Sequence, residues 1–341
     1  MTNTIRDLKE QAQALMEEGE HEDAIDLLKS ATHPALVILR AESFMELEAL
    51  DDAEDTWESL GLSFDKHGTG AFPWVIRGFI DYYLDDAPNA QLAFNQALKL
   101  DPRNVRAILG RSIVFRELEF DRAAALDLDR ALVVLEDEDP KDPATKNFYG
   151  ETFNLKATYA LEDDDLENAE AHLREACDAN PVDADYHLDL ARLLSLKGRI
   201  DEAITNANDA VKADDLLLEA RLLHSQLLGL SGKVDEAVLA ATAAVELDDE
   251  EPYSQIQLAS ALILANQGDE ALAAAERAIS LDPDLVDGYQ LRQSAFLLLE
   301  QEVTPTPDLM EKLNSQPDLP DFIYGERFDP YEQAGEAIAG L

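Results

Sequence analysis

Acidic and histidine side chains are the first candidates for chemistry in this sequence of 341 residues. Two acidic runs, Asp163–Glu167 and Asp282–Gly288, offer the oxygen ligands that calcium prefers. Neither run has oxygen ligands at all the required alternate positions with glycine sixth, so we interpret both as solvated turns between helices. The six histidines are scattered without metal-ligand spacing. We therefore predict no metal site.

Other kinds of catalytic site also lack a signature. Gly110-Arg111-Ser112 does not have the glycine spacing of a phosphate-binding loop. Pairs of acids could be drawn anywhere in so acidic a chain and carry no information about hydrolysis. The single cysteine, Cys177, cannot form an intramolecular disulfide, and its helical context indicates a small buried side chain. We predict no catalytic residues and no cofactor, so the chain is not expected to be an enzyme.

The charge balance limits the partners of this chain. It has 27 Lys and Arg against 72 Asp and Glu, a net charge of −45, while 46% of its residues are hydrophobic. Such a surface repels nucleic acid and anionic membranes and suits basic partners or high intracellular salt. No apolar run is long enough to span a bilayer, and residues 1–7 have no signal-peptide core. We predict a cytoplasmic protein without membrane insertion.

An internal repeat supplies the elements that must position any binding residue. Gly198–Ile204 recurs as Gly232–Val238, and alanines 34 residues apart continue the series in both directions, at Ala169, Ala203, Ala237 and Ala271. A second alanine follows each of these by seven residues, so both lie on one face of a helix. The repeat predicts pairs of helices, with a proline or an acidic turn ending the second helix.

The same register extends through most of the chain. It predicts an all-α solenoid over residues 1–300, with about eight units near 5–33, 34–67, 71–104, 105–138, 150–183, 184–217, 218–251 and 252–285. A capping helix is expected at 286–300 and a tail at 301–341. Eleven extra residues separate Ala124 from Ala169, and we assign them to an acidic, proline-broken loop at Glu136–Pro143. Alanines at 207, 241 and 275 take the place of Phe94, which predicts closer helix packing there.

The sequence resembles the tetratricopeptide repeat family over residues 5–300. The residues that match its pattern in order are Trp74, Gly78, Ala90, Phe94, Ala97 and Pro102. The resemblance implies a right-handed superhelix of antiparallel helix pairs, with a concave groove that the first helix of each pair lines. It also implies that the groove binds a protein or peptide partner. The charged clamp of relatives that hold acidic chaperone C-termini is not present in the matching positions.

Candidate groove residues follow from this resemblance and from helical spacing. They are Phe72, Val75, Phe79, Tyr82, Arg106, Ile113, Arg116, Asn154 and Arg192. Arginines beside aromatic residues would suit a segment with bulky apolar anchors and an acidic flank. The competing interpretation is that the aromatics fill core between repeats and the arginines pair with acids such as Asp81, Asp121 or Glu117.

The tail and the function leave further alternatives open. We expect Phe322, Tyr324 and Phe328 to dock on the last repeats, because a solenoid end exposes apolar surface. For the whole chain, we predict an interaction scaffold that binds a partner segment. The alternative is a structural protein that forms homo-oligomers through solenoid or tail contacts.

Overall fold

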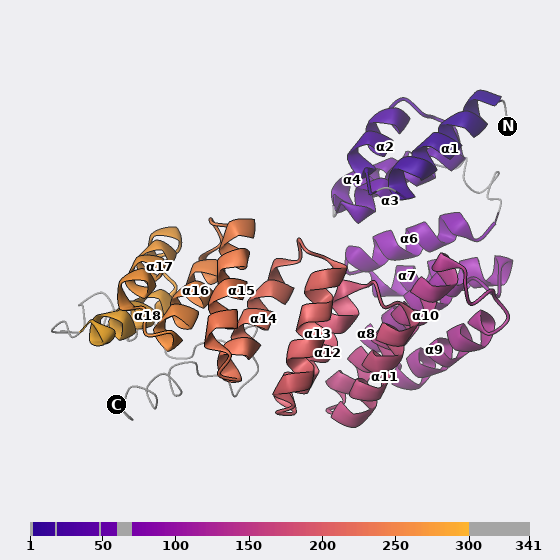
Figure 1. The fold of residues 1–341 in the computed structure, drawn as a ribbon. Coiled ribbons are helices and arrows are strands. Elements are labelled where there is room, and N and C mark those ends of the chain that lie inside the picture. Colours follow the sequence, from indigo (N-terminus) through magenta and orange to yellow (C-terminus); the bar gives the residue numbers. More distant parts are fainter. Residues whose placement is uncertain (1–2, 18, 48, 60–69, 300–341) are drawn as a thin grey trace. The chain divides into compact units, whose positions relative to one another are not determined.

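The computed structural model describes residues 3–17, 19–47, 49–59 and 70–299, and these residues form helices joined by short turns (Figure 1). The fold is the predicted all-α repeat solenoid. The helices are α1 Asn3–Glu17, α2 His21–Leu28, α3 Pro34–Glu46, α4 Leu50–Glu58, α6 Phe72–Tyr83, α7 Ala87–Leu100, α8 Val105–Glu117, α9 Asp121–Leu135, α10 Pro143–Glu162, α11 Leu166–Ala179, α12 Ala184–Leu196, α13 Ile200–Ala213, α14 Leu218–Leu230, α15 Val234–Leu247, α16 Pro252–Leu264, α17 Gly268–Leu281 and α18 Val286–Leu298.

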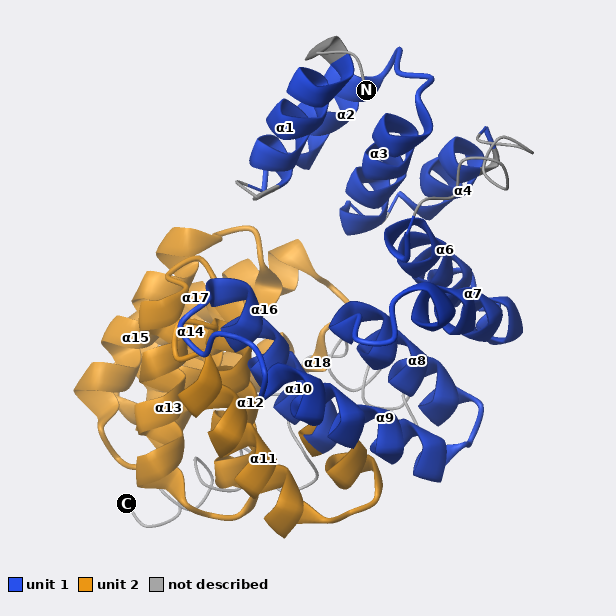
Figure 2. Ribbon diagram, turned by 90° about the vertical axis from the view of Figure 1, so that its right-hand side faces the viewer, with its two compact units in different colours: residues 1–156 blue, residues 157–341 orange. Residues whose placement is uncertain are grey.

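The chain divides into two compact units, residues 1–156 and 157–341 (Figure 2). In each unit, a first helix packs against the second helix of its own repeat, as α6 does against α7 and α12 against α13. First helices of successive repeats also touch, α3 with α6 and α6 with α8 in the first unit, and α12 with α14 and α14 with α16 in the second. Each unit therefore has a continuous face built from first helices. No helix in the described residues is both long and apolar enough to span a bilayer.

The repeated alanines lie at the contact between the two helices of a pair. The first alanine of every regular unit is fully buried, and so is the second: Ala90, Ala97, Ala124, Ala131, Ala169, Ala176, Ala203, Ala210, Ala237, Ala244, Ala271 and Ala278. A methyl side chain lets two helix backbones approach closely, and a larger one would push them apart. The two alanines of each second helix, which the seven-residue spacing placed on one face, are thus both buried.

A left-handed backbone position separates the first helix from the second in repeat after repeat. Gly198 and Gly232 occupy it with φ values of 71° and 76°. Four non-glycine residues take the same register position with φ between 57° and 61°: Asp85, Glu119, Asp164 and Asn266. Glycine adopts this conformation without steric cost, whereas a side chain there is strained by roughly 1 kcal/mol. The Gly-x-x-Asp-Glu-Ala motif therefore marks the turn between paired helices at Gly198 and Gly232.

An aspartate follows the second helix in four of the repeats. The Asp214 side chain accepts a hydrogen bond from the backbone N–H of Leu216, and Asp282 accepts one from Asp284. The same turn recurs at Asp101 and Asp248. These side chains satisfy backbone donors at the exit of the helix and set the direction of the next first helix.

Helix α10 begins earlier than the sequence pattern indicated. The unit expected from residue 150 has its first helix from Pro143, and Pro143 stands at the start of the helix rather than in a loop. The Asp142 carboxylate accepts a hydrogen bond from the backbone N–H of Thr145, which is the geometry of a helix N-cap. Proline has no N–H to lose in the first helical turn, so Asp142-Pro143 starts this helix instead of breaking it.

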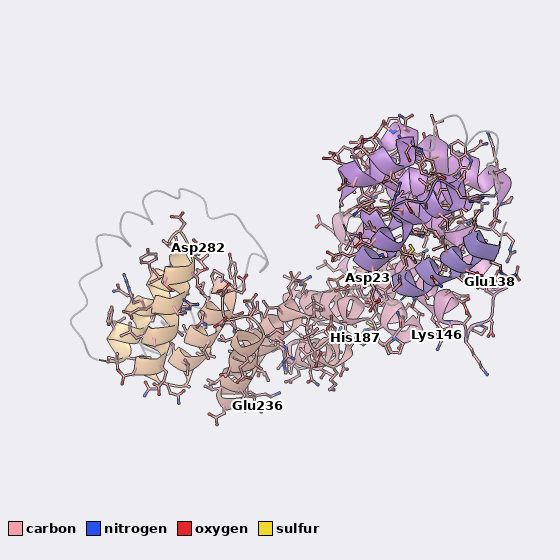
Figure 3. All side chains as sticks on the ribbon, turned by 90° about the horizontal axis from the view of Figure 1, so that it is seen from above. Asp23, Glu138, Lys146, His187, Glu236 and Asp282 are labelled. Carbon is pink, nitrogen blue, oxygen red and sulfur yellow. The ribbon has the colours of Figure 1, made fainter. Side chains whose placement is uncertain are left out.

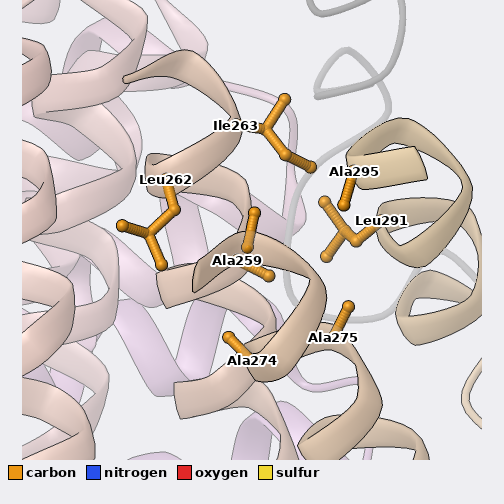
Figure 4. Close-up of a cluster of buried hydrophobic side chains, with 8 residues drawn as sticks. Ala259, Leu262, Ile263, Ala274, Ala275, Leu291 and Ala295 are labelled. Carbon is orange, nitrogen blue, oxygen red and sulfur yellow. The ribbon is translucent and has the colours of Figure 1, made fainter. Parts of the chain in front are cut away.

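Large and small side chains alternate between helices that face each other. Phe94 of α7 is fully buried and lies against Gly78 of α6 and Gly110 of α8. In the last repeats, Ala275 stands at the repeat position of Phe94. Leu291 follows Ala275 by 16 residues, just as Gly110 follows Phe94, and it packs in the same cluster as Ala275 (Figure 4). The facing helix therefore supplies the volume that the alanine lacks.

Replacing Ala203 with leucine should overpack the α12–α13 contact and lower the free energy of unfolding by about 1–3 kcal/mol. Ala203 has no exposed surface, so the added carbon atoms must push the neighbouring helix away. Thr205→Leu, at an exposed position of the same helix, is the matched control and should change stability little. Urea unfolding followed by circular dichroism measures both, and equal stability of the two variants would contradict the packing described.

Candidate functional site

Acidic side chains cover both units, as Asp23 and Glu138 in the first and Glu236 in the second illustrate (Figure 3). The described residues contain no group of three or more His, Cys, Asp or Glu side chains arranged to hold a metal ion. Cys177 is buried, and burial raises the pKa of its thiol to about 12. A thiol with so high a pKa is a poor nucleophile.

The predicted residues of α6 differ in their exposure. Val75 is 1% exposed and belongs to the interior. Phe79 is half-buried, and its ring meets that of Phe94 edge-to-face at 5.1 Å between centroids. Tyr82 is half-buried beside Tyr83, whereas Phe72 is 41% exposed. Phe72 is the most exposed of these four predicted residues, while Val75 and Phe79 contribute to packing between helices.

Arg106 connects three first helices of the first unit. Its guanidinium lies 5.4 Å from the centroid of the Phe79 ring, donates to Glu42 at 2.5 Å and approaches Glu46 at 3.4 Å. Glu42 and Glu46 lie on α3, and Phe79 lies on α6. We call Glu42, Glu46, Phe79, Arg106 and Glu151 the Arg106 cluster.

Carboxylates outnumber cations in the Arg106 cluster. Burial raises the pKa of Glu42, and the opposing effect of Arg106 is smaller. Glu151 of α10 also lies within electrostatic reach of Arg106, and burial raises its pKa as well. Since one guanidinium serves three carboxyl groups, a further cation on this face would be favoured.

The other predicted arginines are also paired with acids of the chain. Arg116 lies 3.1 Å from Asp121, the partner that the competing interpretation named. Arg192, in the second unit, lies 3.2 Å from Asp189 and 2.5 Å from Glu219 on the next first helix. The acidic flank expected of a ligand is therefore supplied at these arginines by the protein itself.

Two further predicted residues are half-buried side chains of first helices. Ile113 lies on α8, and Asn154 lies on α10. Phe322, Tyr324 and Phe328 fall outside the described residues. The structure thus brings Phe79 and Arg106 into contact in the first unit, while Arg192 belongs to the second.

Sequence reasoning missed the acids of the Arg106 cluster. Glu42 and Arg106 are 64 positions apart in the chain and meet only because their first helices stack. It also missed a concentration of cations: residues 72–135 hold eight of the 27 basic residues and nine acids, a net charge of −1. Counting charge along the chain could have found this nearly neutral segment.

Comparisons with known proteins identify the repeat. Residues 154–216 and 222–285 match the family model of the tetratricopeptide repeat. None of the curated proteins matches this sequence. The two matched segments lie in the part of the chain where the 34-residue spacing is strictest.

The chain is also similar to solved structures. A chain in the crystal structure of the APC/C hetero-tetramer Cut9-Hcn1 is similar with a TM-score of 0.53 at 13% identity, covering 84% of this chain and 54% of that one. The chain thus spans about half the length of that relative. MamA (41-end) from Desulfovibrio magneticus RS-1 is similar with 17% identity and a TM-score of 0.46, covering 50% of this chain and 98% of that one. YrrB, described as a TPR protein with an unusual peptide-binding site, is similar with 16% identity and a TM-score of 0.38, covering 69% of this chain and 97% of that one.

Proposed function

We propose that this chain, which is a tetratricopeptide repeat protein, is an interaction scaffold that binds a segment of a partner protein on the face of its first helices. Repeats of this kind are generally interaction scaffolds without a catalytic site, and a likeness of fold alone does not assign a partner. A cytoplasmic location and the absence of enzymatic activity belong to the same proposal.

The Arg106 cluster is the observation that carries the proposal. Successive first helices there place an arginine, a half-buried aromatic ring and three carboxyl groups side by side. Glu46 of the cluster is exposed, and so is Phe72, which lies two helical turns before Phe79 on α6. A partner segment with an apolar or aromatic anchor and a lysine or arginine would complement both the exposed ring and the excess of carboxylates.

This proposal keeps the predicted face and changes the predicted charge of the ligand. The sequence suggested an acidic flank because Arg106 and Arg116 stand out in an acidic chain. Both arginines already have carboxylate partners from this protein. An acidic ligand would have to displace those partners, whereas a basic ligand adds to the carboxylates that remain in excess.

Charge reversal of Glu46 and truncation of Phe72 should each weaken partner binding about tenfold, equivalent to about 1.4 kcal/mol. Immobilised protein first captures the partner from cells of the source organism, and calorimetry with the partner segment then compares the parent with Glu46→Lys and Phe72→Ala. Both side chains are more than one-third exposed, so neither variant disturbs the core.

Matched controls lie on second helices of the same unit. Asp52→Lys reverses a charge on α4, and Leu126→Ala removes an exposed apolar side chain from α9. Both controls should bind within about twofold of the parent. The proposal fails if the first-helix variants bind as tightly as the controls. Light scattering at several concentrations detects the alternative, self-association into homo-oligomers.

A further inference from the structure

A pocket of about 880 Å³ opens on the first unit, over the second helix α7. Its walls come mainly from α7, with α6, α8 and α9 completing the rim. Figure 2 shows these four helices together in the first unit. The residues of the Arg106 cluster do not line this pocket. It is thus a surface different from the one in the proposed function.

The pocket is lined with cations in a chain that is otherwise strongly acidic. Arg77, Lys99, Arg111 and Arg130 line it, and Asp81 is the acid among its lining residues. Arg77 pairs with Asp81, and Arg111 forms two hydrogen bonds of 2.7 Å to Asp127. These ion pairs hold two guanidinium groups in place along the wall.

The remaining two cations have no carboxylate partner among the described residues. The Lys99 ammonium reaches the side-chain oxygen of Gln96 at 3.4 Å, and Lys99 is exposed. Arg130 donates to the backbone carbonyl of Pro102. In a protein with 72 acids, two neighbouring cations left without acids are available to an anionic ligand.

Apolar surface adjoins these cations. Leu92 is 64% exposed on the pocket wall, and the half-buried Trp74 lines the same pocket. A free inorganic anion would use the cations and leave this apolar surface uncovered. A polypeptide segment can place carboxylates and an apolar side chain a few residues apart. Long nucleic acids carry their charge far beyond the pocket, where the rest of this acidic chain repels them.

A second pocket occupies the same register in the second unit and shows what the repeat alone provides. Its volume is about 340 Å³, and Asn208 and His224 line it in the positions that Asn95 and Arg111 hold in the first. Burial lowers the pKa of His224, which favours a neutral ring. Arg221 and Glu236 also line it and contribute one charge of each sign. The repeat creates the hollow, and four cations from α6–α9 make the larger one cationic.

We propose that the pocket over α7 is a second binding site, which takes an acidic segment of a partner polypeptide with an apolar side chain among its carboxylates. The carboxylates contact Lys99 and Arg130, and the apolar side chain covers Leu92 and Trp74. The protein then presents two surfaces of opposite preference: the first-helix face for a basic segment and the α7 pocket for an acidic one. It could join two partners at once.

Fluorescence anisotropy with a labelled peptide Glu-Glu-Leu-Glu-Phe-Glu tests this site on the full chain, and the same peptide with glutamine in place of glutamate is the ligand control. Salt is kept at about 0.15 M, where the Debye length of about 8 Å screens distant repulsion. We expect the acidic peptide to bind and its glutamine analogue to bind at least about tenfold more weakly, a difference of about 1.4 kcal/mol.

Charge-reversal variants locate the site. Lys99→Glu and Arg130→Glu should each weaken peptide binding about tenfold. Lys212→Glu is the matched control, because Lys212 is an exposed lysine in the register of Lys99 on α13, and it should bind like the parent. Glu46→Lys, on the first-helix face, should also keep its affinity for the acidic peptide, which separates this test from that of the proposed function.

Four results would overturn the proposal. One is the absence of peptide binding, and another is an equal loss in Lys99→Glu and Lys212→Glu, which would indicate long-range charge alone. Complete displacement of the peptide by millimolar inorganic phosphate would identify a site for free anions. Tighter binding of a short thymidine oligonucleotide than of the peptide would identify a nucleic-acid site instead.

Discussion

Replacing Phe94 with alanine is expected to lower the free energy of unfolding by about 3–5 kcal/mol, the usual cost of removing a buried aromatic ring. Phe94 has no exposed surface and is among the largest fully buried side chains of the described residues. It fills the space between α6, α7 and α8, where Gly78 and Gly110 contribute no side chain. Neither glycine can extend into the cavity that the substitution leaves, so we expect little relaxation.

Substituting alanine for a glycine that faces Phe94 should change stability in the opposite direction to the same substitution at an ordinary helix glycine. Glycine to alanine inside a helix normally stabilises by about 0.5–1 kcal/mol. A Cβ at Gly110 would lie 2.4 Å from the Phe94 ring, and one at Gly78 would lie 2.6 Å from it. Gly110→Ala alone should therefore destabilise the protein. In the Phe94→Ala background that ring is gone and the nearest remaining atom is the edge of the Phe79 ring at 3.1 Å, so the same substitution should destabilise the protein much less.

Hydrogen exchange of α6–α9 and urea unfolding measure this double-mutant cycle. Exchange reports the affected repeats directly, because each repeat of a solenoid depends mainly on its neighbours. Gly229→Ala is the control, since a Cβ there would meet only the end of the Leu264 side chain at 3.1 Å. If Gly110→Ala has the same effect with and without Phe94, the proposed packing of the ring between the two glycines is wrong.

Replacing Glu170 with glutamine is expected to lower the free energy of unfolding at neutral pH by about 3 kcal/mol, since a tenfold change in proton affinity corresponds to about 1.4 kcal/mol. Hydrogen bonds from Lys197, Arg199 and Arg174 lower the pKa of Glu170 from 4.5 to about 2, against the opposing effect of burial. The carboxylate lies 2.7 Å from Lys197, 2.5 Å from Arg199 and 2.9 Å from Arg174. It joins the second helix α11 to the turn between α12 and α13.

The pH dependence identifies the charge of Glu170 as the cause. A depressed folded-state pKa stabilises the protein above the ordinary value of 4.5, and this contribution is lost as the pH falls towards 2. The stability difference between the parent and Glu170→Gln should thus be constant near neutral pH and shrink as the pH falls below about 4.5.

Glu167→Gln is the matched control for Glu170→Gln. Glu167 contacts the same lysine at 2.9 Å, but its side chain is 86% exposed, so its loss should cost less than about 1 kcal/mol. Urea unfolding at several pH values between about 3.5 and 7 compares the three proteins. A difference between parent and Glu170→Gln that does not change with pH would contradict the ionic origin of the effect.

The periodic features of this fold could be predicted from the sequence. Alanines spaced by 34 residues, with a second alanine seven later, indicated both helices of each regular pair and the face on which they meet. All of these alanines are fully buried. Such local patterns can be recognised in the sequence because each repeat packs in the same way on its neighbours. The same burial pattern must therefore recur at a fixed interval.

Interruptions of the 34-residue period were harder to interpret from the sequence. The extra residues before the unit that contains Ala169 looked like a loop because they hold two prolines. The same Asp-Pro pair can end one element or start a helix, and here the Asp142 cap and Pro143 start α10. The sequence alone did not show which side of the pair would be helical, since no repeated copy of this insertion exists for comparison.

The partners of individual side chains were decided by the tertiary structure. The sequence by itself determined the repeat, its helix pairs and their buried faces, because these follow from spacing within and between neighbouring units. Stacking of first helices then brought Arg106 to Glu42, and the missing side chains of Gly78 and Gly110 made room for Phe94. Stacking also gathered Lys99 and Arg130 beside Leu92 in one pocket. These contacts join residues from different helices, and helical spacing places a residue on a face without specifying what the next helix sets against it.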